Sequence, residues 1–159
     1  MSAFKSIAII GKYLNLSALQ QMQTDLADLA RHLSAKNIEV WLEENTALGA
    51  ELTGFNTCAL EKIGDKVDLA IVMGGDGTML SVARTLMQSD IPLVGINRGR
   101  FGFLTDLRAE EMLISINEIL AGAYQTETRM LLTASVIRAG KQVHQGVAFN
   151  DIVVKSGLR

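Results

Sequence analysis

The feature that most limits how this chain can fold is an apolar segment that runs directly into a glycine-rich turn. Leu69–Met73 (LAIVM) contains no polar residue, and Gly74–Thr78 (GGDGT) follows it without a break. A short apolar run that ends at glycines is typical of a strand buried on both faces of a sheet. Met79–Met87 is expected to continue as a helix. A buried strand, a tight turn and a helix in this order indicate an α/β fold.

The first 42 residues predict the same kind of unit. Ser6–Ile10 is apolar and Ile38–Leu42 alternates with β-branched residues, so both are expected to be strands. Leu16–Lys36 lies between them with apolar residues at helical spacing, and Asn37 suits the end of a helix. A strand, a helix and a second strand predict a parallel sheet with a right-handed crossover.

The middle of the chain is less regular. One weak helix is expected over Thr57–Ile63, within a segment that glycines interrupt. Leu93–Ile96 reads as a further strand that leads into the loop Asn97–Thr105. Glu110–Ala121 has helical spacing, and Gly122 is a typical residue to end it. Together these segments predict an open, Rossmann-like, mostly parallel sheet with flanking helices.

The pattern changes to that of a β structure after about Tyr124. The expected strands are Glu127–Arg138, Val143–Phe149 and Ile152–Val154, with a turn at Ala139–Lys141. We therefore expect an α/β domain over residues 1–125 and the first strands of a β-rich second domain over residues 126–159.

Composition narrows the class of protein. The formal net charge of −2 gives no basic bias toward nucleic acid or an anionic membrane, and no run reaches the roughly 20 apolar residues of a membrane span. The one cysteine, Cys58, excludes an internal disulfide and a cysteine-based zinc cluster. No metal-binding residues of the chain are predicted, and a cytoplasmic location is expected.

The glycine-rich turn is suited to phosphate. Glycines permit positive φ and let the backbone approach a ligand closely. Their N–H groups, together with the positive end of the following helix, can hold phosphate oxygens at the carboxyl end of a strand. Gly74–Thr78 lacks both the P-loop pattern and the GxGxxG pattern.

An aspartate inside such a turn needs an explanation because its charge opposes phosphate binding. Asp76 is therefore a candidate to orient and deprotonate an attacking hydroxyl group. The alternative is that Asp76 caps the following helix and that the glycines only form a tight turn.

At this point the sequence resembles a known family. Leu69–Leu80 (LAIVMGGDGTML) is similar to the signature of the NAD kinases, which use ATP or polyphosphate. Gly95–Leu104 (GINRGRFGFL) and Arg129–Leu132 resemble two further family segments, and Asn150-Asp151 in VAFNDIVV resembles the family's asparagine–acid motif. The order and spacing agree across nearly the whole chain, which makes the set more specific than the turn alone.

The resemblance implies a reaction and roles for the turn. NAD and ATP would give NADP and ADP, with a divalent metal such as Mg²⁺ accompanying ATP. Asp76 would contact the 2′-hydroxyl of the adenosine ribose and act as the base, with Gly77 beside it at the NAD. Gly74 and Gly75 would lie near the phosphoryl donor.

The resemblance also implies binding residues outside the turn. Phe103 would line the adenine pocket, and Asn150 and Asp151 would bind the dinucleotide. The family's β-rich domain continues well beyond the point that this chain reaches, so the 159-residue chain is expected to be incomplete and inactive alone. The apolar segment Leu131–Val154 would then present an uncovered edge or face and favour a homo-oligomer.

Two other functions remain open at the level of the sequence. Diacylglycerol-type lipid kinases use a similar turn, although Met79–Arg84 lacks the acidic and asparagine residues that usually follow it there. The chain could also be a non-catalytic module that binds nucleotides or assembles with a partner. Arg98 and Arg100, in the loop after a strand, could contact a phosphate or simply be solvated.

Overall fold

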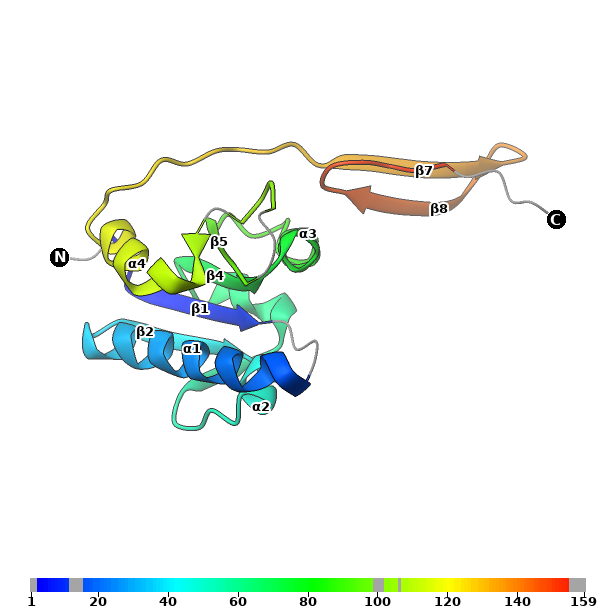
Figure 1. Cartoon of the computed structure of the whole chain (residues 1–159). Coiled ribbons are helices and arrows are strands. Elements are labelled where there is room, and N and C mark those ends of the chain that lie inside the picture. The colour runs from blue at the N-terminus through cyan, green and yellow to red at the C-terminus, as the bar shows by residue number, and fades with distance from the viewer. Residues whose placement is uncertain (1–2, 12–15, 99–101, 106, 155–159) are drawn as a thin grey trace. The chain divides into compact units, whose positions relative to one another are not determined.

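The structure is a computed structural model, and it describes residues 3–11, 16–98, 102–105 and 107–154 (Figure 1). The chain divides into two compact units, Met1–Gln125 and Thr126–Arg159. Each unit is described by itself.

The first unit is built on a parallel sheet. Within the described residues the sheet has six strands in the order β3-β2-β1-β4-β5-β6, and every neighbouring pair is parallel. The strands are β1 (Ser6–Gly11), β2 (Glu39–Glu43), β3 (Asn56–Cys58), β4 (Leu69–Gly74), β5 (Leu93–Asn97) and β6 (Leu107–Arg108). This strand order is that of the doubly wound dinucleotide-binding folds.

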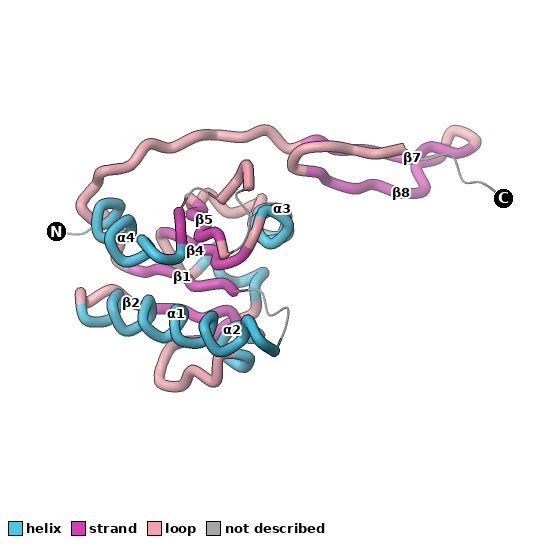
Figure 2. Tube along the Cα trace, in the orientation of Figure 1, coloured by secondary structure: helices cyan, strands magenta, loops and turns pink. Residues whose placement is uncertain are grey.

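Helices cover both faces of this sheet (Figures 1 and 2). The α-helices are α1 (Leu16–Ala35), α2 (Glu44–Gly49), α3 (Asp76–Thr85) and α4 (Met112–Leu120), with 3₁₀ turns at Leu60–Asp65 and Ala109–Glu111. The α1 and α4 helices pack on one face, whereas α3 and the first 3₁₀ turn pack on the other. A parallel sheet needs this two-sided cover because its strands are apolar on both faces.

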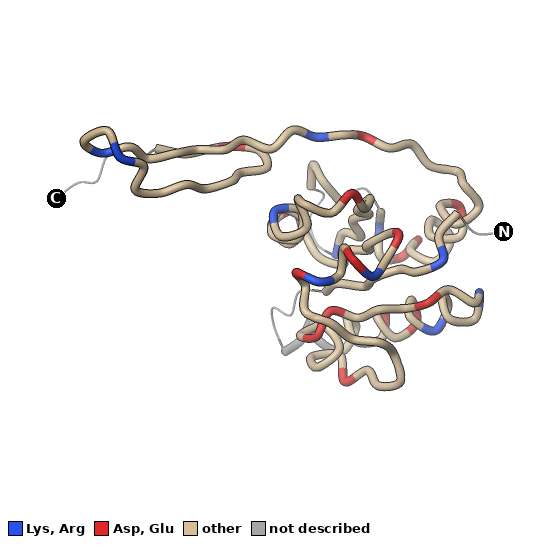
Figure 3. Tube along the Cα trace, turned by 180° about the vertical axis from the view of Figure 1, so that it is seen from behind, with Lys and Arg blue, Asp and Glu red and all other residues tan. Residues whose placement is uncertain are grey.

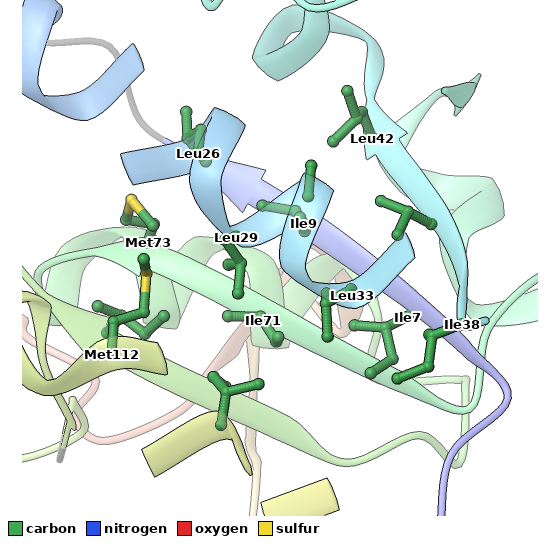
Figure 4. Packing of buried hydrophobic residues seen from close by; sticks show 14 of the residues in the cluster. Ile7, Ile9, Leu26, Leu29, Leu33, Ile38, Leu42, Ile71, Met73 and Met112 are labelled. Carbon is green, nitrogen blue, oxygen red and sulfur yellow. The ribbon is translucent and has the colours of Figure 1, made fainter. Parts of the chain in front are cut away.

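The side chains of β1 show how the two layers are filled. Ile7 and Ile9 belong to the apolar cluster with Leu29 of α1, while Ala8 and Ile10 belong to the cluster under α3. Figure 4 shows Ile7 and Ile9 beside Leu29 and its neighbours on α1. Successive side chains point to opposite faces of a strand, so a fully apolar strand contributes to both clusters.

The structure confirms the predicted open, mostly parallel α/β sheet with flanking helices. Two details of the expectation were wrong. The helix expected over Thr57–Ile63 is absent: Thr57 and Cys58 lie in β3, and a 3₁₀ turn begins at Leu60. The expected start of the helix after the glycine-rich turn was also too late, because α3 begins at Asp76 rather than at Met79.

The short α2 helix was not expected, and a buried carboxylate explains it. Glu43, 6% exposed, accepts hydrogen bonds from the backbone N–H groups of Asn45 (3.0 Å) and Thr46 (2.8 Å). The hydroxyl of Thr46 lies 2.8 Å from the same carboxylate and 2.9 Å from the backbone nitrogen of Gly11. Glu43 therefore caps α2, and Thr46 connects this cap to the end of β1.

The second unit is a β-hairpin. Strands β7 (Leu132–Arg138) and β8 (Lys141–Ala148) pair antiparallel, and the turn between them has positive φ at Ala139 and Gly140. The strand expected from Glu127 begins later, at Leu132, and Ile152–Val154 is not in a strand. Ile137 is 66% exposed and Val143 is 55% exposed, so the hairpin presents apolar side chains to solvent.

None of the helices in the described part of the chain is both long and apolar enough to cross a membrane.

At the end of the sheet where β1 and β4 begin, the carboxylate of Asp68 makes a contribution to stability that depends on pH. Oδ2 of Asp68 accepts hydrogen bonds from the backbone N–H groups of Lys5 (2.8 Å) and Ser6 (3.1 Å), and these bonds lower the pKa of Asp68. A folded-state pKa below the unfolded value stabilises the fold above the unfolded pKa of about 4, and this stabilisation is lost as the pH falls through the folded pKa.

We therefore expect Asp68→Asn to lower the free energy of unfolding at pH 7 by about 1 kcal/mol, a modest value because the site is exposed to solvent. The difference from the wild type should shrink at pH 3, and urea denaturation at both pH values measures it. Asp65→Asn, at an exposed carboxylate nearby, is the control and should change stability at pH 7 by less than about 0.5 kcal/mol. Equal differences at pH 7 and pH 3 would contradict the assignment.

Candidate functional site

The strand order places a switch point between β1 and β4. The chain passes from β1 to β2 on one side of β1, and later enters β4 on its other side. Connections that leave in opposite directions open a crevice at the carboxyl ends of such neighbouring strands, where ligands bind in open α/β sheets. In the register, Gly11 lies beside Met73, and Gly74 lies beside Asn97. The glycine-rich turn is therefore at this edge.

The turn joins β4 to α3 with very little intervening chain. Strand β4 ends at Gly74, Gly75 is the N-cap residue, and α3 begins with Asp76. The carbonyl oxygen of Gly75 accepts hydrogen bonds from the N–H groups of Thr78 (2.9 Å) and Met79 (3.1 Å). The N–H groups of the first turn of α3 thus begin directly at the sheet edge, as an anion-binding helix terminus requires.

The glycines of the turn matter for the space beside them rather than for a left-handed backbone. The glycines with positive φ in the described residues are Gly54, Gly122 and Gly140, so Gly74, Gly75 and Gly77 do not use the freedom of glycine to adopt positive φ. At Gly74 a Cβ atom would lie 2.6 Å from Oγ1 of Thr78. At Gly75 and Gly77 a Cβ atom would have no neighbour within 4 Å. Gly74 permits close packing of the helix on the strand, whereas Gly75 and Gly77 leave the surface of the turn open.

Asp76 contacts the loop that follows the neighbouring strand β5. Its Oδ2 accepts a hydrogen bond from the backbone N–H of Phe103 (2.7 Å). Its Oδ1 accepts one from the N–H of Leu104 (3.1 Å) and one from the hydroxyl of Thr105 (3.3 Å). The cap of α3 is Gly75, and the carboxylate of Asp76 is directed to residues 103–105. The alternative reading of Asp76 as the helix cap is therefore wrong.

Sequence reasoning did not identify Leu104 and Thr105 as contacts of Asp76. They lie 28 and 29 positions away along the chain. A sequence signal did exist, because the loops after β4 and β5 leave adjacent strands at the same edge of the sheet.

Phe103 and Arg98 lie in this second loop and differ in exposure. The side chain of Phe103 is 90% exposed, although its backbone N–H binds Asp76. Arg98 forms an ion pair with Asp25 of α1, and both side chains are largely shielded from solvent. Burial lowers the pKa of the Arg98 guanidinium, and the charge of Glu110 opposes this effect. Arg98 thus fixes the start of the loop to α1, and Arg100 lies outside the described residues.

The other two predicted binding residues belong to the second unit. Asn150 and Asp151 follow the end of β8 at Ala148, and both are exposed. Their place directly after a strand agrees with the local pattern that the sequence indicated.

Other reactive side chains do not form a second cluster in the described part of the chain. No group of three or more His, Cys, Asp or Glu residues there could hold a metal ion. Figure 3 shows basic and acidic positions interspersed along the trace of the first unit. Cys58 is buried, and burial raises the pKa of its thiol, as expected for a packing residue rather than a nucleophile.

The fold and this edge define an α/β domain of the doubly wound class with a glycine-rich, acid-containing turn at its switch point. A family model described as the ATP-NAD kinase N-terminal domain matches residues 9–124. The chain belongs to the NAD kinase family.

Individual relatives agree with the family model. The NAD kinase of Nitrosomonas eutropha is 46% identical over 98% of this chain and 51% of its own length, and that of Nitrosospira multiformis is 46% identical over 99% and 52%. The chain therefore spans about half the length of the curated relatives that it matches.

Two solved structures share the fold. The yeast NADH kinase complexed with NADH aligns with a TM-score of 0.74 at 17% identity, over 92% of this chain and 47% of its own. An NAD kinase from Archaeoglobus fulgidus in complex with ATP aligns with a TM-score of 0.58 at 21% identity, over 81% and 42%.

The different surroundings of Gly74 and Gly75 give a testable contrast. Gly74→Ala should destabilise the first unit by about 1 to 3 kcal/mol because its Cβ would collide with Thr78. Gly75→Ala should change stability by less than about 1 kcal/mol, because its φ of −109° suits any residue and the space beside it is open. Urea denaturation of both variants measures the contrast, and equal destabilisation would contradict the packing role of Gly74.

Proposed function

We propose that the chain carries the phosphoryl-transfer edge of an NAD kinase, which converts NAD and ATP into NADP and ADP. One observation carries the proposal: in a chain of the NAD kinase family, a carboxylate lies within a glycine-rich turn at the switch point of the sheet. Relatives named NAD kinase support NAD as the acceptor. The resemblance to a structure that contains ATP supports ATP as the donor, and polyphosphate remains a second candidate.

In this proposal the turn binds both substrates. Gly74 and Gly75 lie near the phosphoryl donor, which meets the N–H groups at the start of α3. Gly77 and Asp76 contact the adenosine ribose of NAD, and the open space beside Gly75 and Gly77 supports close approach of a ligand. Phe103 lines the adenine pocket, for which its exposed ring is suited, and its backbone N–H binds Asp76.

Asp76 acts as the base that orients the 2′-hydroxyl and accepts its proton. A carboxylate is a weak base, so most of the rate enhancement comes from positioning and from neutralising the charge of the phosphates. The chain places oxygen atoms at this edge, but the described residues offer no cluster of three metal ligands. A Mg²⁺ ion suits such an edge because it binds chiefly to phosphates and water, and it would neutralise charge on the transferred group.

The remaining parts of the proposal concern the second unit and the assembly. Asn150 and Asp151 bind the dinucleotide, with the carboxylate on ribose hydroxyls. The exposed apolar residues of the hairpin support a homo-oligomer or a β-rich domain that covers them. The protein is proposed to act in the cytoplasm.

The first test measures NADP formation by Asp76→Asn, which keeps the size of the side chain and removes its charge. We expect turnover to fall by about 100-fold or more, because a general base contributes on that order. A coupled assay for NADP is run beside calorimetry of NAD and of ATP binding. Asp28→Asn, at an exposed carboxylate that pairs with Arg31 on α1, is the control and should keep wild-type turnover.

The assay is run on two forms of the protein, since the chain spans about half the length of its relatives. One form is the 159-residue chain, and the other carries the second half of the Nitrosomonas eutropha NAD kinase after it. Turnover that appears in either form and is lost in Asp76→Asn supports the proposal. Absence of NADP from both wild-type forms would refute it, and phosphorylation of liposomes instead would favour the lipid kinase.

A further inference from the structure

The three hydrogen bonds to the carboxylate of Asp76 are divided unevenly between its two oxygen atoms. Oδ1 accepts two of them, from the N–H of Leu104 and from the hydroxyl of Thr105, whereas Oδ2 accepts one, from the N–H of Phe103. Each oxygen of an ionised carboxylate has two lone pairs. Among these contacts, therefore, both lone pairs of Oδ1 are engaged and one lone pair of Oδ2 is left.

Thr105 is the side chain that fixes this arrangement. It is 1% exposed, and it packs over β5, where a Cβ atom added to Gly95 would lie 2.8 Å from Cγ2 and 2.9 Å from Cα of Thr105. Burial against β5 restricts the conformations that Thr105 can adopt. Its hydroxyl therefore reaches Oδ1 of Asp76 from a rigid part of the fold.

The other end of the same loop is shaped around the carboxylate. A Cβ atom at Gly102 would lie 2.0 Å from Oδ1 and 2.7 Å from Oδ2 of Asp76. The backbone of Gly102 thus covers one side of the carboxylate, and a larger residue there would displace it. Gly102 and Thr105 lie at the two ends of this loop segment, and both restrict the position of the Asp76 carboxylate.

We propose that Thr105 is a positioning residue that holds Asp76 so that Oδ2 is the oxygen that receives the substrate proton. This inference rests on the proposed function. In the reaction the 2′-oxygen forms a bond to the γ-phosphorus, and the bond from that phosphorus to the bridging oxygen of ATP breaks. The electron pair of that bond leaves on ADP, and the hydroxyl proton passes to Oδ2 of Asp76.

A purely structural role for Thr105 predicts a different result. If the hydroxyl only closed the loop, its loss would lower stability and weaken substrate binding without a specific effect on turnover. A positioning role acts on the transition state, so its loss lowers kcat more than it changes KM.

The test compares Thr105→Val with Thr105→Ser in whichever form of the protein produces NADP. Thr105→Val keeps the shape and removes the hydroxyl, and kcat should fall by about tenfold while KM for NAD changes by less than about twofold. Thr105→Ser keeps the hydroxyl and should recover kcat to within about threefold of the wild type. Thr85→Val, at the far end of α3 where the hydroxyl lies 3.1 Å from the carbonyl oxygen of Ser81, is the control with unchanged kcat.

A second measurement tests the contact without turnover. Asp76→Ala removes the acceptor, so the amide hydrogens of Phe103 and Leu104 should exchange with solvent about tenfold faster or more. Unchanged exchange would overturn the inference. An active wild type with unchanged kcat in Thr105→Val would overturn the role of Thr105 alone, whereas absence of NADP from both wild-type forms would overturn the proposed function itself.

Discussion

The parallel sheet is the constraint on which the rest of the first unit depends. Its central strand β4 is buried on both faces, from Leu69 to Met73, so helices must cover it on each side. This cover requires the chain to cross from one end of the sheet to the other between strands. All loops that follow strands then gather at one edge, and the switch between β1 and β4 brings the glycine-rich turn there.

The sequence was sufficient to predict the parts of the fold in which local pattern and tertiary burial agree. Leu69–Met73 is a continuous apolar run that ends at a glycine, and the long helix α1 has apolar residues at helical spacing with Asn37 just after its end. The region between β2 and β4 could not be predicted in the same way. Strand β3 is three residues long, and it is a strand because it pairs with β2. This pairing joins residues that are distant along the chain. The α2 helix depends on the buried carboxylate of Glu43 rather than on helix propensity.

The second unit shows a different limit of local reasoning. The turn at Ala139-Gly140 has the positive φ that a hairpin needs, and the pairing of β7 with β8 follows from it. An isolated two-stranded hairpin is marginally stable in water, and this one exposes Ile137 and Val143. The relatives are about twice as long as the chain. A hairpin of this kind gains stability from further strands or another partner, and a local pattern does not specify which residues supply them.

The candidate site also depends on a contact that no local pattern contains. A carboxylate repels phosphate, so its presence in a turn that is proposed to bind phosphate is costly unless other groups stabilise the negative charge. The sequence indicated that the charge of Asp76 opposes phosphate binding, but it did not predict which groups stabilise that charge. In the structure three donors from residues 103–105 surround the carboxylate, and they come from a loop that only the sheet brings close. The same donors that stabilise the charge also fix its direction, so the stability of the turn and the orientation of the proposed base have one physical cause.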